Sequence, residues 1–173
     1  MNAIRSIGRF MYTVLLVAAV NVGLAAAPSD DVPIHLPRTE LARDSAATLH
    51  SAARAFLKYH EACARGDHAP LEQVLTADTR IEYSLREPDS WLSTSAVSPS
   101  LDCASRLSAT PARIAELWVF PTANPNAVFI EYELRTGGSS RRELALVEMK
   151  DGRIARLLSF AEPPTSMLAG LSR

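Results

Sequence analysis

The fold is decided by the stretch Phe56-Leu57-Lys58-Tyr59-His60-Glu61-Ala62-Cys63-Ala64-Arg65-Gly66-Asp67. Together with the residues before it, this stretch repeats apolar side chains at helical spacing on one side and charged side chains on the other. The pattern predicts a long amphipathic helix over 42–65. Gly66 ends it, because glycine readily adopts the backbone conformation of a helix C-terminus. We expect the rest of the domain to pack around this helix.

The chain after the helix changes from a helical to a strand-like pattern. A second, short helix is predicted beyond Asp67, with Pro70 in its first turn. Ile81, Tyr83 and Leu85 then alternate with polar residues, which indicates a strand. Residues 87–111 are rich in Ser, Pro and Thr, and a loop with one short helix at 100–107 is expected there.

Strands are predicted over the last part of the domain, in the segments Ile114–Phe120, Ala127–Arg135, Arg141–Met149 and Ile154–Ala161. Two links between them have the composition of turns, 136–140 and 150–152, and the second is expected to be the tighter. Helices followed by an antiparallel run of strands predict an α+β fold with the helices on one face of the sheet. The domain is predicted to span 41–162, with a flexible tail at 163–173.

The N-terminal region reads as an export signal. Residues 1–27 combine Arg5 and Arg9, an apolar run and a small-residue end, which is the pattern of a signal peptide. The alternative is an uncleaved membrane anchor, although the apolar run is shorter than the roughly 20 residues that span a bilayer. Residues 28–40 carry three prolines and are expected to form an extended leader. A periplasmic or secreted protein, free of the membrane after cleavage, is therefore predicted.

Export places the two cysteines in an oxidising compartment, where disulfides persist. A bridge between Cys63 and Cys103 is predicted, which adds about 4 kcal/mol of stability in the chain-entropy model. The alternative is two buried free thiols. His60 and Cys63 have helical spacing suitable for two metal ligands, but no second pair accompanies them, so no metal site is expected.

Composition excludes some functions. The chain has 173 residues, 47% of them hydrophobic and 21% charged, with a formal net charge of −1. This length suits one domain, or two at most. The longest basic run is Arg141-Arg142, whereas a nucleic-acid-binding surface needs concentrated positive charge, so nucleic acid is not an expected partner. A Gly-rich phosphate loop is also missing, and no cofactor is expected.

The opening stretch resembles the first helix and its exit in nuclear transport factor 2-like proteins, a group that includes ketosteroid isomerases and SnoaL-like polyketide cyclases. Leu75–Tyr83 is similar to the group's entry into its first strand, and Asp151-Gly152-Arg153-Ile154 to the turn between its last two strands. The resemblance covers about residues 45–162. It implies a cone-shaped fold, with a curved antiparallel sheet wrapped over the long helix, a mostly apolar pocket, and often a homodimer.

The resemblance allows isomerase chemistry to be checked residue by residue. Ketosteroid isomerases use a carboxylate base, with a tyrosine and a protonated carboxylic acid to stabilise the oxyanion. Tyr59 stands at the oxyanion position, but the base position holds Tyr83, whose ordinary pKa of about 10 makes it a poor base. Ala145 or an apolar neighbour stands at the acid position. One of three roles is present, so this activity is not expected.

Five residues are candidates for a ligand pocket between helix and sheet: Tyr59, His60, Tyr83, Phe56 and Trp118. His60 lies in the apolar stripe, where it is either a general base or a core histidine with a hydrogen-bond partner. Trp118 either lines the cavity mouth or packs at the sheet edge. Glu131 and Glu133 share one strand face, where a paired-carboxylate role competes with a solvated or subunit-contact surface.

These observations favour an exported small-ligand-binding or protein-interaction module without a complete catalytic set, its partner a small apolar molecule. The alternative is a lyase, cyclase or isomerase that acts on an apolar substrate, with His60 and Tyr59 as its polar groups. A third class is a structural homodimer in which the sheet face is the functional surface.

Overall fold

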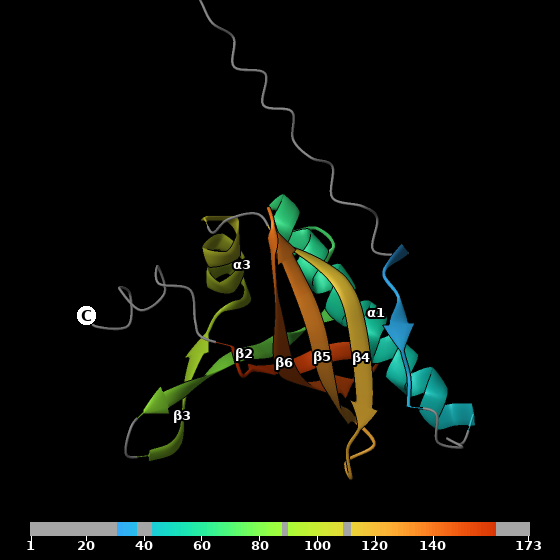
Figure 1. The fold of residues 1–173 in the computed structure, drawn as a ribbon. Helices are drawn as coiled ribbons and strands as arrows, with labels where there is room; N and C mark the ends of the chain where they lie inside the picture. Colours follow the sequence, from blue (N-terminus) through green and yellow to red (C-terminus); the bar gives the residue numbers. More distant parts are fainter. Residues whose placement is uncertain (1–30, 38–42, 88–89, 109–111, 162–173) are drawn as a thin grey trace, which may run out of the picture.

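The computed structural model describes residues 31–37, 43–87, 90–108 and 112–161 (Figure 1). The predicted signal peptide and the predicted tail at 163–173 lie outside these ranges. In chain order the elements are β1 (Ile34–His35), α1 (Arg43–Arg65), α2 (Leu71–Val74), β2 (Leu75–Glu87), β3 (Ser90–Val97), α3 (Pro99–Ser108), β4 (Arg113–Pro121), β5 (Ala127–Thr136), β6 (Ser139–Lys150) and β7 (Arg153–Ser159). No helix in the described ranges is both long enough and apolar enough to cross a bilayer.

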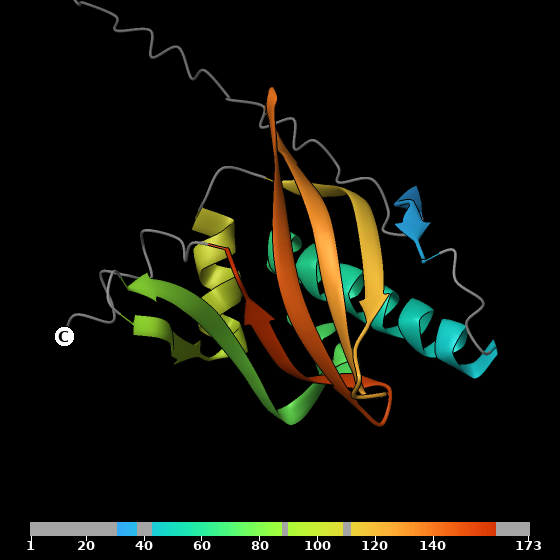
Figure 2. The same ribbon diagram turned by 60° about the horizontal axis from the view of Figure 1, so that its bottom comes forward.

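The strands form one curved sheet in the order β1-β4-β5-β6-β7-β2-β3, and α1 crosses one of its faces (Figures 1 and 2). This is the expected α+β fold. The sheet is mixed rather than wholly antiparallel, because β2 pairs with β7, and β1 with β4, in parallel. A hairpin makes two strands antiparallel only when they are neighbours in the chain. These strands are joined by long connections, so local sequence patterns do not predict their direction.

The α1 helix ends as its sequence predicts. Gly66 has a φ of +67°, in the left-handed region. Its N–H donates to the Cys63 carbonyl (3.2 Å), and the Asp67 N–H donates to the Ala62 carbonyl (3.0 Å). These two bonds form a Schellman motif, which satisfies carbonyl groups at the helix end and turns the chain toward α2. The apolar face of α1 is fully buried at Ala52, Ala53, Phe56 and Tyr59.

The two predicted turns join β5 to β6 and β6 to β7. Both links have only two residues, so the first is as tight as the second, contrary to expectation. Gly137 has a φ of +55°, and Asp151 and Gly152 have φ values of +51° and +75°. Two-residue hairpins need left-handed residues at these positions, because that backbone twist matches the twist of the strands.

Residues 87–111 contain more regular structure than the sequence predicts. The expected helix is present as α3, but β3 precedes it where a loop was predicted. Its Ser- and Thr-rich sequence pairs antiparallel with β2, with Ile81 opposite Val97. Pairing with an existing strand supplies the hydrogen bonds, so β3 forms without a strong strand pattern of its own.

The leader contributes the edge strand β1. Its Ile34 and His35 pair with Leu117 and Trp118 of β4, and the Leu117 N–H donates to the Pro33 carbonyl (3.1 Å). Val32, Ile34 and Leu36 pack against the hydrophobic core. The part of the predicted leader that the structure describes is therefore attached to the sheet.

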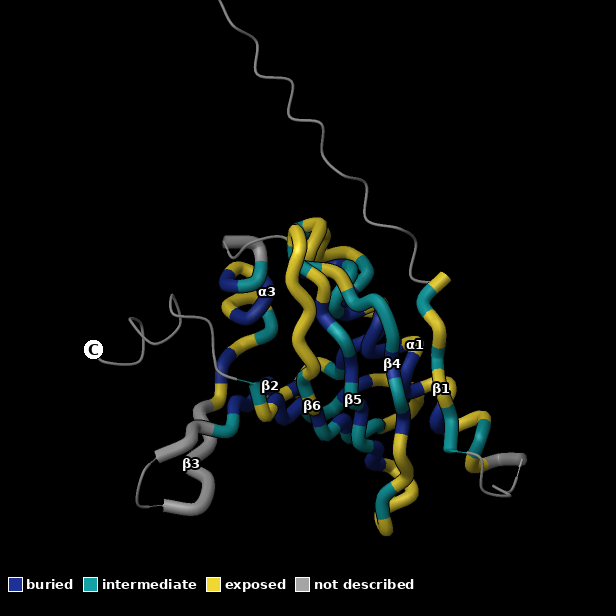
Figure 3. Tube along the Cα trace, in the orientation of Figure 1, coloured by how far each residue is buried: buried dark blue, intermediate teal, exposed yellow. Residues whose placement is uncertain are grey.

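Buried and less buried positions alternate along β5, so one sheet face packs on α1 and the other lies outward (Figure 3).

Candidate functional site

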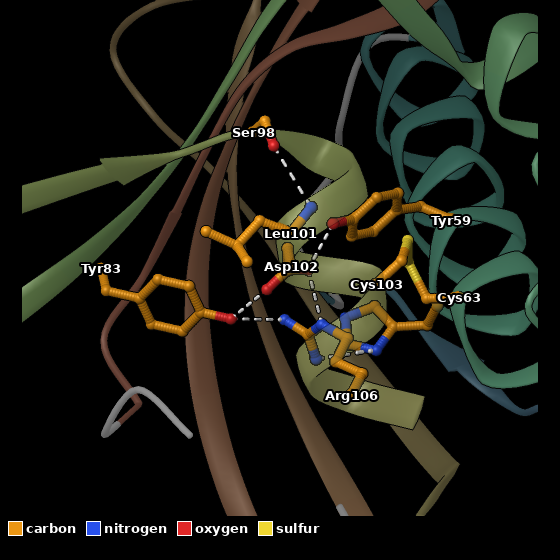
Figure 4. Close-up of a disulfide and its surroundings, with 9 residues drawn as sticks. Tyr59, Cys63, Tyr83, Ser98, Leu101, Asp102, Cys103 and Arg106 are labelled. Carbon is orange, nitrogen blue, oxygen red and sulfur yellow. Dashed lines mark hydrogen bonds and ion pairs between the residues drawn. A yellow bond between two sulfur atoms is a disulfide. The ribbon is translucent and has the colours of Figure 1, made fainter. Parts of the chain in front are cut away.

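A buried carboxylate lies where α1, α3 and β2 meet. Asp102 of α3 is fully buried, and its two oxygens accept hydrogen bonds from the Tyr59 and Tyr83 hydroxyls (Figure 4). Tyr59 comes from α1 and Tyr83 from β2, so the carboxylate joins three elements. Burying a charge is unfavourable unless it is paired and hydrogen-bonded, and here both conditions are met.

Arg106 supplies the opposite charge, one helical turn beyond Asp102. Its Nε donates to Asp102 Oδ2 (2.7 Å), and one terminal nitrogen donates to the Tyr83 hydroxyl (3.2 Å). The other terminal nitrogen lies 3.4 Å from His60 Nδ1. Burial alone lowers the pKa of Arg106, but the Asp102 carboxylate and nearby phenols raise it well above its ordinary value. The guanidinium therefore stays charged and balances Asp102.

The two tyrosines are hydrogen-bond donors rather than bases. Burial, followed by the Asp102 carboxylate, raises the pKa of Tyr59 well above its ordinary value. Burial also raises the pKa of Tyr83, with Asp102 adding to the rise and Arg106 opposing it. Both phenols stay protonated at neutral pH. Since a base must be unprotonated, Tyr83 cannot serve at the base position of the isomerases.

His60 has one ring nitrogen without a partner. Arginine can only donate, so Nδ1 accepts from Arg106 and the neutral ring carries its hydrogen on Nε2. Nε2 is buried and has no hydrogen-bond partner among the described residues. Burial, and then Arg106, lower the pKa of His60 well below its usual value, so the ring is neutral at pH 7. His60 therefore presents an N–H donor, not a free base.

A disulfide fixes the two helices that hold these groups. The predicted bridge between Cys63 and Cys103 is present and joins α1 to α3 (Figure 4). The Cα atoms of the two cysteines are 4.4 Å apart. Cys63 follows Tyr59 by one helical turn, and Cys103 directly follows Asp102. The covalent link thus stands next to the hydrogen bond between Tyr59 and Asp102.

A second carboxylate stands on the sheet side of His60. Glu143 of β6 accepts a hydrogen bond from the Tyr132 hydroxyl of β5 (2.6 Å) and pairs with Arg141 (2.7 Å). The Tyr132 ring contacts His60 edge-on, with ring centroids 5.4 Å apart. Burial, and then Glu143, raise the pKa of Tyr132, so this phenol is also a donor.

Four of the five predicted pocket residues come together. Tyr59, His60 and Tyr83 share the Asp102–Arg106 cluster, and the Phe56 ring lies 4.4 Å from the His60 ring, centroid to centroid. Trp118 does not join them. It lies on the outer sheet face, stacked on His35 and covered by the Arg142 guanidinium at 4.5 Å.

The sequence reasoning missed the centre of the cluster, Asp102 and Arg106. Their spacing of four residues on a predicted helix is the signal that points to them, because such pairs are neighbours on a helix surface. Glu131 and Glu133 lie on the outer face, as the apolar alternation predicts, and pair with Arg142 (3.2 Å) and Arg135 (2.8 Å). They do not form a carboxylate pair facing the interior.

The described residues do not supply the complete set of groups that ketosteroid isomerases use. Tyr59 donates to Asp102, Tyr83 is a donor, and the acid position falls at buried Ala145 or an apolar neighbour, none of which carries a carboxyl group. Within the described ranges no cluster of three or more His, Cys, Asp or Glu residues could hold a metal ion. A surface cleft of about 680 Å³ lies elsewhere, lined by His68, Leu71, Glu72, Leu75, Thr76, Ala77, Pro99, Ser100 and Arg153.

Solved structures show the same architecture. A phenazine biosynthesis-related protein from Pseudomonas aeruginosa superposes with a TM-score of 0.50 at 17% identity, over 73% of this chain and 88% of its own. At this identity the likeness shows a shared fold and nothing about activity. A nuclear transport factor 2-like protein of unknown function from Mesorhizobium loti has a TM-score of 0.48 at 18% identity, over 76% of this chain and 99% of its own.

A ketosteroid isomerase from Mycobacterium sp. also resembles the chain, with a TM-score of 0.47 at 16% identity, over 65% of this chain and 93% of its own. At these identities the likeness concerns the fold alone. No family model and no curated protein sequence matches the chain. Activity has to be argued from the site, because this fold can carry different functions.

Proposed function

We propose that this protein is an exported small-ligand-binding module in which His60 contacts the ligand between α1 and the sheet. The observation that carries the proposal is the unpartnered, buried Nε2 of His60. A buried donor without an acceptor costs about 1–3 kcal/mol, so an acceptor atom of a ligand would recover free energy there.

The surroundings of His60 support an apolar ligand body. The rings of Phe56, Tyr59 and Tyr132 pack around the imidazole, with centroid distances of 4.4, 5.8 and 5.4 Å. Ligand sites are mostly apolar with a few placed polar groups that orient the ligand. One N–H among three aromatic rings has this character.

Binding is favoured over catalysis because the charged groups are already engaged. Both Asp102 oxygens accept hydrogen bonds, and the Arg106 guanidinium donates hydrogen bonds to Asp102, Tyr83 and His60. General acid–base catalysis needs a group that can take or give a proton at the substrate. Asp102 would have to give up hydrogen bonds inside the protein before it could act on a substrate.

The test uses 1-indanone, a small apolar ketone, as the probe. Titration followed by NMR should shift the signals of Phe56, His60 and Tyr132, and leave those of Trp118 on the outer face unchanged. Shifts confined to the cleft at Leu71, or none at all, would contradict the proposal. Exchange of the ketone's α-hydrogens in D₂O accelerated a hundredfold by the protein, and lost in His60→Gln, would establish the enzyme alternative instead.

Export forms part of the same proposal. The signal-peptide pattern of residues 1–27 supports it, and so does the disulfide between Cys63 and Cys103, which persists in oxidising compartments. Intact-mass analysis of periplasmic or secreted protein should find a chain that begins near Ala26 or Pro28. Membrane-bound protein that retains Met1 would indicate an anchor.

We also propose that the outer sheet face joins two copies of the chain. Apolar side chains gather there in the outer-face patch, which consists of Phe120, Phe129, Leu144, Leu146 and Phe160, and Phe120, Leu144 and Phe160 are each about 40% exposed. The neighbouring charges are paired within the chain, as in Arg142 with Glu131. A face with balanced charges and an apolar centre can meet its own copy without repulsion.

A further inference from the structure

We infer that Arg106 determines the ligand specificity of the site. Arg106 can only donate hydrogen bonds, so it keeps His60 in the tautomer that donates from Nε2. The ligand must therefore be a neutral apolar molecule with a carbonyl or other acceptor oxygen. This inference rests on the proposed function and names its ligand class. Arg106 acts here as a positioning residue, since it works through His60.

The hydrogen bond between Arg106 and His60 has a fixed direction. Guanidinium groups have five N–H donors and no acceptor, and they do not lose a proton in proteins. The Arg106 nitrogen 3.4 Å from His60 Nδ1 therefore always faces it as a donor. A hydrogen on Nδ1 would point at another hydrogen. The neutral imidazole avoids this clash only as the tautomer protonated at Nε2.

Arg106 is held in place by two other contacts. Its Nε bonds Asp102 at 2.7 Å, and a terminal nitrogen bonds the Tyr83 hydroxyl at 3.2 Å. Asp102 is in turn held by Tyr59 and, through the adjacent Cys103, by the disulfide to α1. A guanidinium anchored at two other points keeps a constant orientation toward His60, so the tautomer is a permanent property of the site.

As a hydrogen-bond donor, His60 Nε2 binds acceptor atoms only. In the described part of the chain no acceptor reaches this atom, and its neighbours are aromatic rings. A ligand N–H would face the Nε2 hydrogen and be rejected, whereas a carbonyl oxygen would accept it. Asp102 and Arg106 cancel each other's charge, so the cluster has no net charge to attract an ionic ligand. A neutral ketone, aldehyde, ester or lactone fits these requirements.

The experiment compares three bicyclic probes of similar shape. 1-Indanone has an acceptor oxygen, indole has only an N–H donor, and indane has neither. With the wild-type protein we expect 1-indanone to bind roughly 2- to 10-fold more tightly than indane, as one hydrogen bond provides, and indole to bind no more tightly than indane. Equal affinities for 1-indanone and indole would overturn the inference.

The tautomer is measured independently of any ligand. In protein labelled with ¹⁵N-histidine, the His60 nitrogens should appear at neutral pH as protonated Nε2 and unprotonated Nδ1. In Arg106→Met the donor at Nδ1 is gone, and we expect a mixture of tautomers together with loss of the preference for 1-indanone. Protonated Nδ1 in the wild type, or an unchanged tautomer and preference in the variant, would overturn the assignment to Arg106.

Two further variants keep the test decisive. Asp102→Asn combined with Arg106→Met removes both charges, so that no buried charge is left unpaired if the single variant fails to fold. Arg142→Met removes an arginine from the outer face and should change neither tautomer nor preference. If all three probes bind equally, the module binds ligands but the inference is wrong. If none binds, the proposed function and the ligand class both fail, and the ¹⁵N spectra alone judge the role of Arg106.

Discussion

Asp102 is the residue on which the interior of this protein depends. It is fully buried, yet it accepts hydrogen bonds from Tyr59, Tyr83 and Arg106. Hydrogen bonds to an ionised group are stronger than those between neutral groups. The two tyrosines connect the Asp102 carboxylate to α1 and β2, and Arg106 neutralises its charge. The residue therefore links α1, β2 and α3 through one carboxylate.

Asp102→Asn should destabilise the protein by roughly 3 kcal/mol, because it leaves the Arg106 guanidinium without its counter-charge in a largely buried site. Urea unfolding measures the difference. Asp151→Asn is the matched control, since Asp151 is exposed in a turn at a φ of +51°, a conformation that asparagine tolerates. That control should stay within about 0.5 kcal/mol of wild type. A similarly small effect of Asp102→Asn would show that the buried charge is not important for stability.

His60 should make stability depend on pH. Burial and Arg106 lower its pKa in the folded protein, while the unfolded chain titrates near the ordinary value of about 6.5. Below that pH the unfolded state binds the proton and the folded state does not, so stability falls as the pH falls. The slope from one such group is at most about 1.4 kcal/mol per pH unit.

Arg106 lowers the pKa of His60 in the same direction as burial does. Arg106 of α3 repels a second positive charge, and the phenols of Tyr59 and Tyr132 are neutral. Between pH 7 and pH 5, His60→Gln should lose less stability than the wild type, as measured by urea unfolding at each pH. His50→Gln, at an exposed position of the same helix, should retain the wild-type slope. Equal slopes in wild type and His60→Gln would refute the depressed pKa.

Among the elements, the contact between α1 and α3 is the one held by a covalent bond. Cys63 and Cys103 are both fully buried, so the bridge is enclosed where the two helices touch. It lies in the same layer as the hydrogen bond from Tyr59 to Asp102. The disulfide therefore stabilises the domain and also limits how far the polar cluster can rearrange.

Replacing both cysteines by serine should cost about 2–5 kcal/mol of unfolding free energy, mainly through the added freedom of the unfolded chain. Thiol titration of the denatured wild-type protein without reductant should find no free thiol. Two reactive thiols per chain would show that the bridge does not form in the isolated protein.

The hairpin between β5 and β6 depends on one of its two glycines. Gly137 has a φ of +55°, whereas Gly138 lies outside the left-handed region, and a Cβ at either position would meet nothing within 4 Å. Gly137→Ala should cost about 1–2 kcal/mol from backbone strain alone. Gly138→Ala should be neutral or slightly stabilising, because it reduces the freedom of the unfolded chain. Thermal unfolding of the two variants compares them directly, and equal effects would contradict the turn geometry.

For the whole molecule, the proposed homodimer is the property to test. Phe120→Lys and Leu144→Lys place charges in the outer-face patch, at side chains 41% and 37% exposed. Each should convert a dimer into a folded monomer in sedimentation velocity, because an apolar interface centre does not accept an unpaired charge. Leu101→Lys is the control, since Leu101 is 48% exposed but lies on α3. A wild-type protein that sediments as a monomer at high concentration would rule out this assembly.

Much of this molecule is determined by short-range sequence patterns. The 3.6-residue period before Gly66 makes α1 one amphipathic helix, and Gly66 ends it in the left-handed conformation. Asp151-Gly152 makes the last hairpin, since its backbone needs two left-handed residues. These features are readable from the sequence because each depends on residues a few positions apart. The bridge between the cysteines is also predictable, because the sequence has only two of them and residues 1–27 have the pattern of an export signal.

Other features exist only in the tertiary structure. Apolar residues occupy both faces of β4, so alternation alone does not tell which face meets α1, and Trp118 proves to lie outside. The parallel pairing of β2 with β7 joins strands that are far apart in the chain, where no turn sets the direction. The sequence around Asp102 does not distinguish it from an ordinary helix residue. Its partners Tyr59 and Tyr83 come from α1 and β2 and meet it only in the folded protein. A buried charge is tolerated only where its partners converge, and that convergence is decided by packing rather than by neighbours in sequence.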